Sequence, residues 1–292
     1  MNSVIEYLND VEWLYSLAYI FTGTLLFFIG RFLYKMTHRD IDVPYELVEN
    51  DNFAFSISYV GYFIAVVIII GASIVGESQG LETDLINILV YGLLGILFLH
   101  ISSWLSNALM FKHFHLKKEV VTDRNEGAGV IFASIYIVNA LILYGSIIGE
   151  GQSLLHGIST FVIYWALANV LLVLSTFVYS KTLDYDIHLE IEKDNVAAGI
   201  SFSGALLAIG IIIMNAISHE FVDWSTTIID IFVQGILGIV LLPLVRIIAD
   251  KILLPGQKLT DEIAHQEKPN CGAALMEAFC YIGAAMFILW SI

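Results

Sequence analysis

The chain of 292 residues contains eight stretches that are each long and apolar enough to cross a lipid bilayer. A transmembrane helix needs about 20 mostly apolar residues to cross roughly 30 Å of hydrocarbon. The stretches that meet this requirement are Val11–Tyr34, Phe53–Val75, Leu85–Phe111, Gly127–Ile148, Leu154–Tyr179, Val196–Ser218, Ser225–Leu254 and Cys271–Ile292. Their apolar residues do not follow the period of two expected of membrane β-strands, and helices are then the only structures that the bilayer core admits. The sequence predicts an all-α polytopic membrane protein with eight transmembrane helices.

Composition supports this class and excludes others. Hydrophobic residues make up 58% of the chain and charged residues 14%, whereas soluble domains average roughly 45–50% and about 25%. The formal net charge of −15 argues against a nucleic-acid partner, since phosphate binding needs a basic surface. Cys271 and Cys280 are too far apart on one helix to form a disulfide. Because Met1–Asp10 has no cationic leader, we expect the first stretch to be retained rather than cleaved as a signal peptide.

The distribution of lysine and arginine predicts the orientation. All 13 lie in, or just inside, the loops that follow the first, third, fifth and seventh stretches. The other loops and both termini contain none, only acidic residues such as Glu77 and Asp223. Cationic loops face the cytoplasm. We therefore expect both termini to lie outside and the basic loops to lie in the cytoplasm.

A repeat divides the chain into two halves. A shift of 143 residues places Glu49–Asn52 on Glu192–Asn195 and Gly61 on Gly204. The sequence thus predicts two four-helix membrane units, residues 1–150 and 151–292, each made of two helical hairpins. Because four is an even number, the units insert in the same direction as parallel repeats. Such a chain resembles a built-in dimer of a smaller protein.

A shorter motif opens every second helix. It consists of an asparagine followed mostly by small residues, and its asparagines are Asn52, Asn125, Asn195 and Asn270. Asparagine is a good helix N-cap because its side-chain oxygen accepts a hydrogen bond from a free amide of the first turn. Small residues let helix backbones approach closely within a membrane. We therefore interpret the four asparagines as structural helix caps.

The segment Glu192–Gly204, together with Asn270-Cys-Gly-Ala-Ala, resembles domain-of-unknown-function family 350. The first unit departs from the family signature at Phe53-Ala-Phe and Glu126-Gly-Ala. The resemblance implies a bacterial inner (plasma) membrane protein, periplasmic termini and a four-helix unit used twice, and it implies no established chemistry. Genes of the family often neighbour those of phage-shock-protein-A-like membrane-remodelling proteins, so such a protein is the cytoplasmic partner that the resemblance suggests.

Charged residues at membrane depth are the candidate functional residues. Arg246 and Glu277 lie on the order of 10–12 Å from the inner ends of the last two helices, at 1.5 Å per residue, and we predict that they pair. The pair would act as an ion or proton relay, or would fix one helix against the other. Asp230 and Asn215 lie at comparable depth near the outer side and form a second intramembrane polar candidate.

Two inner loops alternate apolar and polar residues. Asp184–Glu192 does so strictly and Ile41–Leu47 nearly so. A period of two is typical of a half-buried strand. We expect either a short two-stranded ribbon beneath the bundle or extended linkers along the membrane surface.

The chain contains no phosphate-binding loop, no His-Glu-x-x-His and no spaced Ser-His-Asp set. His38, His113 and His115 match no zinc pattern. We therefore expect no enzyme activity, metal or cofactor. The favoured function is a scaffold or docking component of envelope and membrane maintenance. An ion or small-solute channel or transporter is the alternative, and an intramembrane enzyme ranks last. The lipid bilayer is an expected partner, and homo-oligomerisation stays open.

Overall fold

The computed structural model describes residues 12–111, 117–148, 154–219, 223–253 and 256–291, and every regular element among them is helical. Each predicted apolar stretch corresponds to one long helix. The long helices are α2 (Glu12–Thr37), α3 (Phe53–Ile74), α4 (Leu81–Met110), α5 (Glu126–Ile148), α6 (Leu154–Thr182), α8 (Val196–Ile217), α9 (Trp224–Leu253) and α10 (Cys271–Ser291). Over the part of the chain that the structure describes, α2, α3, α4, α5, α6, α8 and α10 are each long and apolar enough to span a membrane.

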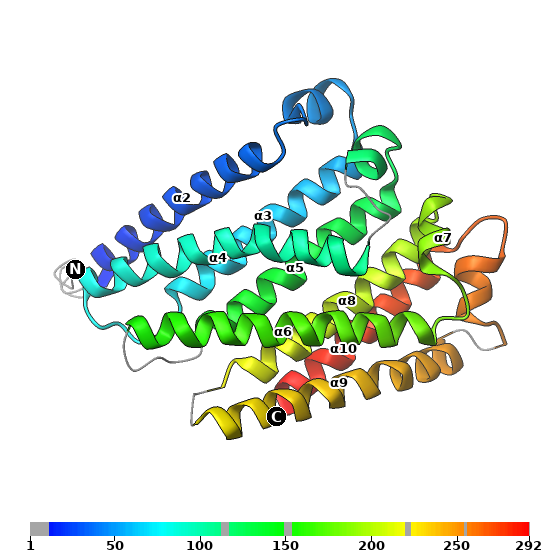
Figure 1. The fold of residues 1–292 in the computed structure, drawn as a ribbon. Helices are drawn as coiled ribbons and strands as arrows, with labels where there is room; N and C mark the ends of the chain where they lie inside the picture. The colour runs from blue at the N-terminus through cyan, green and yellow to red at the C-terminus, as the bar shows by residue number, and fades with distance from the viewer. Residues whose placement is uncertain (1–11, 112–116, 149–153, 220–222, 254–255, 292) are drawn as a thin grey trace, which may run out of the picture.

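The long helices form two layers. The inner layer is a row in the order α3, α5, α8 and α10, in which each helix packs along its neighbour. The outer layer follows the same order with α2, α4, α6 and α9, and Figure 1 shows α4, α6 and α9 in front of α5, α8 and α10. The row is open, so α3 and α10 each have only one neighbour in the inner layer. The two hydrophobic cores lie between the layers.

Glycine and alanine allow the inner helices to approach closely. A Cβ atom added to Gly61 of α3 would lie 2.4 Å from the Cα of Ala133 in α5. A Cβ atom added to Gly204 of α8 would lie 2.4 Å from the Cα of Ala278 in α10. The two contacts are equivalent under the sequence repeat. The small residues of the motif therefore act as packing surfaces, as they do in other membrane helices.

Four short helices precede the inner helices and lie at one end of the molecule. They are η1 (Tyr45–Glu49), η2 (Lys117–Thr122), α7 (Ile187–Glu192) and η3 (Asp261–His265). In Figure 1 they follow one another down the right-hand end, from blue through green to orange. The short helices thus repeat the order of the inner row.

The predicted ribbon or extended linkers are wrong, because both segments contain short helices. Asp186 caps α7 by accepting hydrogen bonds from the amides of His188 and Leu189. Ile187 and Ile191 are four residues apart, so a helix places both on one buried face. Over so few residues, alternating polarity is compatible with this helix as well as with a strand.

Candidate functional site

Two buried charges of the second unit, Arg246 and Glu277, lie together at the α9–α10 contact. The Nε of Arg246 is 3.7 Å from the Oε1 of Glu277. Glu277 is completely buried and Arg246 is 9% exposed. The structure thus brings together the pair that the sequence predicts, and it places the pair inside the protein rather than against lipid.

Both carboxylate oxygens of Glu277 accept hydrogen bonds. Ser201 of α8 donates to Oε2, and Tyr281 donates to Oε1 at 3.1 Å. Tyr179 of α6 in turn donates to the hydroxyl of Tyr281 at 3.2 Å. A buried charge is tolerated when such bonds replace its hydration. The cluster therefore joins α6, α8, α9 and α10, and Ser201 and Tyr179 in it were missed because they lie far from Glu277 in sequence.

Arg246 is held less completely. Its Nη2 donates to the hydroxyl of Thr260 at 3.1 Å, and its guanidinium lies 5.9 Å from the centre of the Tyr185 ring. Its Nη1 is buried without a hydrogen-bond partner. Burial raises the pKa of Tyr185 to about 12, so this phenol keeps its proton at neutral pH. Thr260 and the Tyr185 ring therefore hold the Arg246 guanidinium in place, and its Nη1 donor has no acceptor.

The first unit has the same frame without the charges. Ser103 and Phe132 occupy the places of Arg246 and Glu277, while the tyrosines and the serine recur as Tyr34, Tyr136 and Ser58. The hydroxyls of Tyr34, Ser58 and Ser103 are buried without a hydrogen-bond partner. The ion pair is therefore a feature of the second unit alone among these equivalent positions.

The other sequence candidates are not brought together. Asp230 is exposed and Asn215 is half-buried, and no hydrogen bond joins these two residues. His113 and His115 lie outside the described residues. His38 stacks on Tyr34 with ring centres 4.2 Å apart, and burial lowers its pKa. Within the described ranges, no three His, Cys, Asp or Glu side chains are grouped as a metal site would need.

The four asparagines occupy the N-cap positions of the inner helices. Each side-chain oxygen accepts a hydrogen bond from the amide three residues later, which belongs to Phe55, Ala128, Ala198 or Ala273. The backbone N–H of each asparagine donates to the backbone carbonyl of a glutamate in the preceding short helix, which is Glu46, Glu119, Glu190 or Glu262. The cap therefore also ties the short helix to the inner helix.

The Nδ2 groups of three asparagines connect neighbouring loops. Asn52 donates to the carbonyl of Val120 at 3.0 Å, Asn125 to that of Ile191 at 2.6 Å, and Asn195 to that of Ile263 at 2.8 Å. Each acceptor directly follows the glutamate of the next short helix. We call these three bonds the asparagine links. They join the four short helices into one row, a role that the sequence motif did not indicate.

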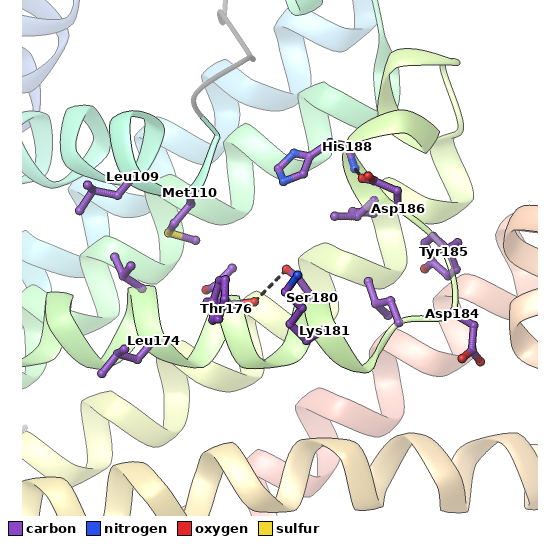
Figure 2. Close-up of a pocket in the computed structure, with 14 residues that line it drawn as sticks. Leu109, Met110, Leu174, Thr176, Ser180, Lys181, Asp184, Tyr185, Asp186 and His188 are labelled. Atoms are coloured by element: carbon purple, nitrogen blue, oxygen red, sulfur yellow. Dashed lines mark hydrogen bonds between the residues drawn. The ribbon is translucent and has the colours of Figure 1, made fainter.

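Two grooves lie at equivalent places in the two units. The groove of the second unit, about 650 Å³, runs between the end of α6 and α7 and is bounded on its far side by Leu109 and Met110 of α4 (Figure 2). The groove of the first unit, about 970 Å³, lies between α2, η1 and α3. Arg31, Lys35 and Arg39 line it. The first groove is the larger and the more basic of the two.

Comparison with known proteins agrees with the tandem arrangement. Residues 7–147 and 153–292 each match the model of a family described as Domain of Unknown Function (DUF350). The chain is 24% identical over 254 residues to the "UPF0719 transmembrane protein" of Aquifex aeolicus (strain VF5), an alignment that covers 86% of this chain and 90% of that relative. No solved structure matches the chain.

Proposed function

Because the chain belongs to the Domain of Unknown Function family 350, carried as two tandem copies, we propose that it is a non-catalytic scaffold in the bacterial inner membrane. It crosses the membrane eight times, with α9 as the seventh span and with both termini in the periplasm. Its cytoplasmic loops dock a partner that takes part in envelope and membrane maintenance. The membrane location itself agrees with the transmembrane relative and with the apolar helices.

The observation that carries this proposal is the close packing of the inner row. Its helices meet through glycine and alanine at backbone distance, as at Gly61 and Gly204. Glu277, the most deeply buried charge, is enclosed by Ser201, Tyr281 and Arg246. A water-filled pathway would instead need polar side chains lining an open axis. The close packing of the inner helices and the enclosure of Glu277 therefore favour a scaffold over a channel or transporter.

The end that carries the short helices is suited to docking. Its exposed side chains are strongly charged, and they include Lys117, Asp123, Lys193, Asp261 and Lys268. Arginine and lysine at this end support its cytoplasmic orientation. The partner that we propose for it is a phage-shock-protein-A-like protein, the class that the family resemblance suggests.

Docking is tested by binding of a purified phage-shock-protein-A-like protein to the scaffold in nanodiscs. We expect binding to be lost when the lysines of loops 112–126 and 251–268 are replaced by glutamine, because these substitutions remove the positive charge and leave the asparagine caps and Thr260 in place. Replacement of residues 76–80, in a loop at the opposite end, serves as the matched control. Binding that is indifferent to the two basic loops would contradict the docking proposal.

The alternative function, a channel or transporter, is favoured by one observation, the unpartnered Nη1 of the buried Arg246. Ion flux in proteoliposomes distinguishes the two functions. We expect no flux above that of protein-free vesicles, at either sign of the voltage. Flux that changes with Glu277→Gln or Asp230→Asn would overturn the scaffold proposal and make these acids pathway residues.

A further inference from the structure

We propose that the open row continues from one molecule to the next, with α10 of one copy packing against α3 of a second copy as α5 packs against α8 within the chain. The inference does not depend on the proposed function. It rests on three features: a hydrogen bond that is made three times but not a fourth, side chains at the two ends that complement each other, and a groove that lacks one wall.

The first feature is the last asparagine of the row. Asn52, Asn125 and Asn195 are buried and form the asparagine links to Val120, Ile191 and Ile263. Asn270 is exposed, and its Nδ2 donates only to Glu262 of its own loop. The Nδ2 of Asn270 therefore has no carbonyl of a neighbouring loop to bind, unlike that of the other three asparagines.

The matching acceptor lies at the other end of the molecule. Leu47 directly follows Glu46 in η1, as Val120 follows Glu119 and Ile263 follows Glu262. None of the four capping asparagine side chains donates to the carbonyl of Leu47. A second copy placed next to α10 would bring this carbonyl to Asn270, and the link would form between molecules.

The second feature is an exchange of large and small residues between the two helix faces. Inside the chain, Gly210 of α8 receives Val138 of α5, whose Cγ1 would lie 3.1 Å from an added Cβ. At the ends, the equivalent positions are Val67 on α3 and Gly283 on α10. Val67 is 57% exposed, and nothing lies within 4 Å of a Cβ added to Gly283. Within the chain the valine is on α5 and the glycine on α8, whereas at the ends the glycine is on α10, the equivalent of α5, and the valine is on α3, the equivalent of α8. Each pair still combines one large and one small residue, so the end faces complement each other.

The same exchange occurs between five and six turns from the caps, 19 or 20 residues after the capping asparagines. Inside the chain, Gly145 of α5 approaches α8, where an added Cβ would lie 2.8 Å from the carbonyl oxygen of Met214. At the ends, the equivalent positions are Trp290 on α10, which is 71% exposed, and Gly71 on α3, where an added Cβ would meet nothing within 4 Å. In the proposed contact, Trp290 of one copy therefore lies opposite Gly71 of the next copy.

The third feature is the open groove of the first unit. In the second unit, Leu109 and Met110 of the preceding α4 form the far wall of the equivalent groove (Figure 2). All residues that line the groove of the first unit come from residues 27–63. The element equivalent to α4 is α9, so the end of α9 in a second copy would supply the missing wall.

The contact joins two different surfaces and leaves a free α3 and a free α10 at the ends of the pair. Such head-to-tail contacts produce chains or closed rings of molecules rather than a two-fold dimer. All copies keep the same orientation in the membrane, because α5 and α8 begin at the same end of the molecule. The end of each chain would remain open to further copies.

The contact is tested by disulfide cross-linking in native membranes. The variant carries Phe53→Cys and Gly272→Cys in a background of Cys271→Ser and Cys280→Ala. The equivalent internal positions are close, since a Cβ added to Gly127 would lie 3.3 Å from the Cα of Val196. We expect a ladder of dimers, trimers and larger species. The matched control combines Gly272→Cys with Trp104→Cys, an equally lipid-exposed position on α4, and we expect it to stay monomeric.

Two further variants probe the contact itself, with self-association measured by single-molecule photobleaching in lipid vesicles. Asn270→Ser keeps a capping oxygen but removes the Nδ2 donor, and we expect about threefold weaker association. Gly283→Val fills the space for Val67, and we expect at least about tenfold weaker association. Adding Val67→Gly to Gly283→Val recreates the internal pair and should restore association.

Three results would overturn the inference. The first is a wild-type protein that stays monomeric at every protein-to-lipid ratio, which would leave lipid as the occupant of both faces. The second is cross-linking of the Trp104 control equal to that of the Phe53 variant. The third is a Gly283→Val variant that keeps wild-type thermal stability and wild-type association.

Discussion

Glu277 and Arg246 illustrate how single residues determine which helices of this protein stay together. Two charges buried at one contact cost desolvation energy, and their mutual attraction with added hydrogen bonds offsets that cost. Here the bonds come from Ser201 and Tyr281 to Glu277 and from Arg246 to Thr260. Removal of one charge leaves the other buried and uncompensated. The pair therefore specifies the packing of α9 against α10 more than it adds net stability.

The Glu277→Gln substitution tests the hypothesis that the ion pair holds α9 against α10. We expect it to lower stability by about 3–5 kcal/mol, because Arg246 loses its counter-charge inside the protein. Thermal unfolding in detergent measures the change. Asp230→Asn, at an exposed acid of α9, is the matched control and should have little effect. The double variant Arg246→Met with Glu277→Gln should recover most of the loss. A double variant as unstable as the single one would contradict the pairing.

Glu190 provides a prediction about pH. Burial acts to raise its pKa, but hydrogen bonds from Lys193 and Asn195 outweigh burial and hold the pKa below the ordinary value of 4.5. A carboxyl with a lowered folded-state pKa stabilises the protein above its unfolded pKa, and this stability is lost as the pH falls through the folded value.

The unfolding temperatures of the wild type and of Glu190→Gln should therefore differ at pH 7 and converge below pH 4.5. The same comparison with Asp184→Asn, an exposed acid of the same loop, should show no such convergence. A difference for Glu190→Gln that persists unchanged to pH 3 would contradict the role of this carboxylate as the acceptor for Lys193 and Asn195.

At the scale of the elements, the inner helices depend on positions where no side chain fits. Gly204 and Ala278 bring α8 and α10 into backbone contact, and Gly129 does the same for α5 at Ala54 of α3. The repeated motif predicted such positions, since small residues recur after every cap. It did not show which helices would be partners, because small residues on a helix face fit any similar face.

Gly204→Leu tests the close approach of α8 and α10. The added side chain would collide with the backbone of Ala278, and we expect a loss of at least about 1–3 kcal/mol. The matched control is Gly71→Leu, the same substitution at a position where an added Cβ meets nothing within 4 Å. Thermal unfolding in detergent compares the two variants. Equal stability of Gly204→Leu and the wild type would contradict the close contact of α8 with α10 at this position.

At the scale of the whole molecule, the arrangement is a two-layered row whose short helices all lie at one end (Figure 1). Four connections at this end carry an asparagine cap and a glutamate, and three of the caps hold the next loop. The row is therefore fastened along its polar end by hydrogen bonds and along its apolar length by close packing. Such a body presents its polar end to one side of the membrane.

The orientation of the whole molecule can be tested with membrane-impermeant thiol reagents. In a background of Cys271→Ser and Cys280→Ala, Lys193→Cys should be labelled only from the cytoplasmic side and Ser78→Cys only from the outside. Both positions are exposed and lie at opposite ends of the molecule. Labelling of Lys193→Cys in intact cells would reverse the proposed orientation.

The sequence by itself determined the long helices, the tandem units and the capping role of the asparagines. These features depend on local length, apolarity and hydrogen bonding within one turn, which neighbouring residues specify. Only the tertiary structure decided that the inner helices form an open row, that Ser201 and Tyr179 complete the cluster at Glu277, and that each Nδ2 binds the next loop. These contacts join residues about 70 to 100 positions apart. Apolar helices of similar composition could pack in several orders, and only the fit between particular faces selects one.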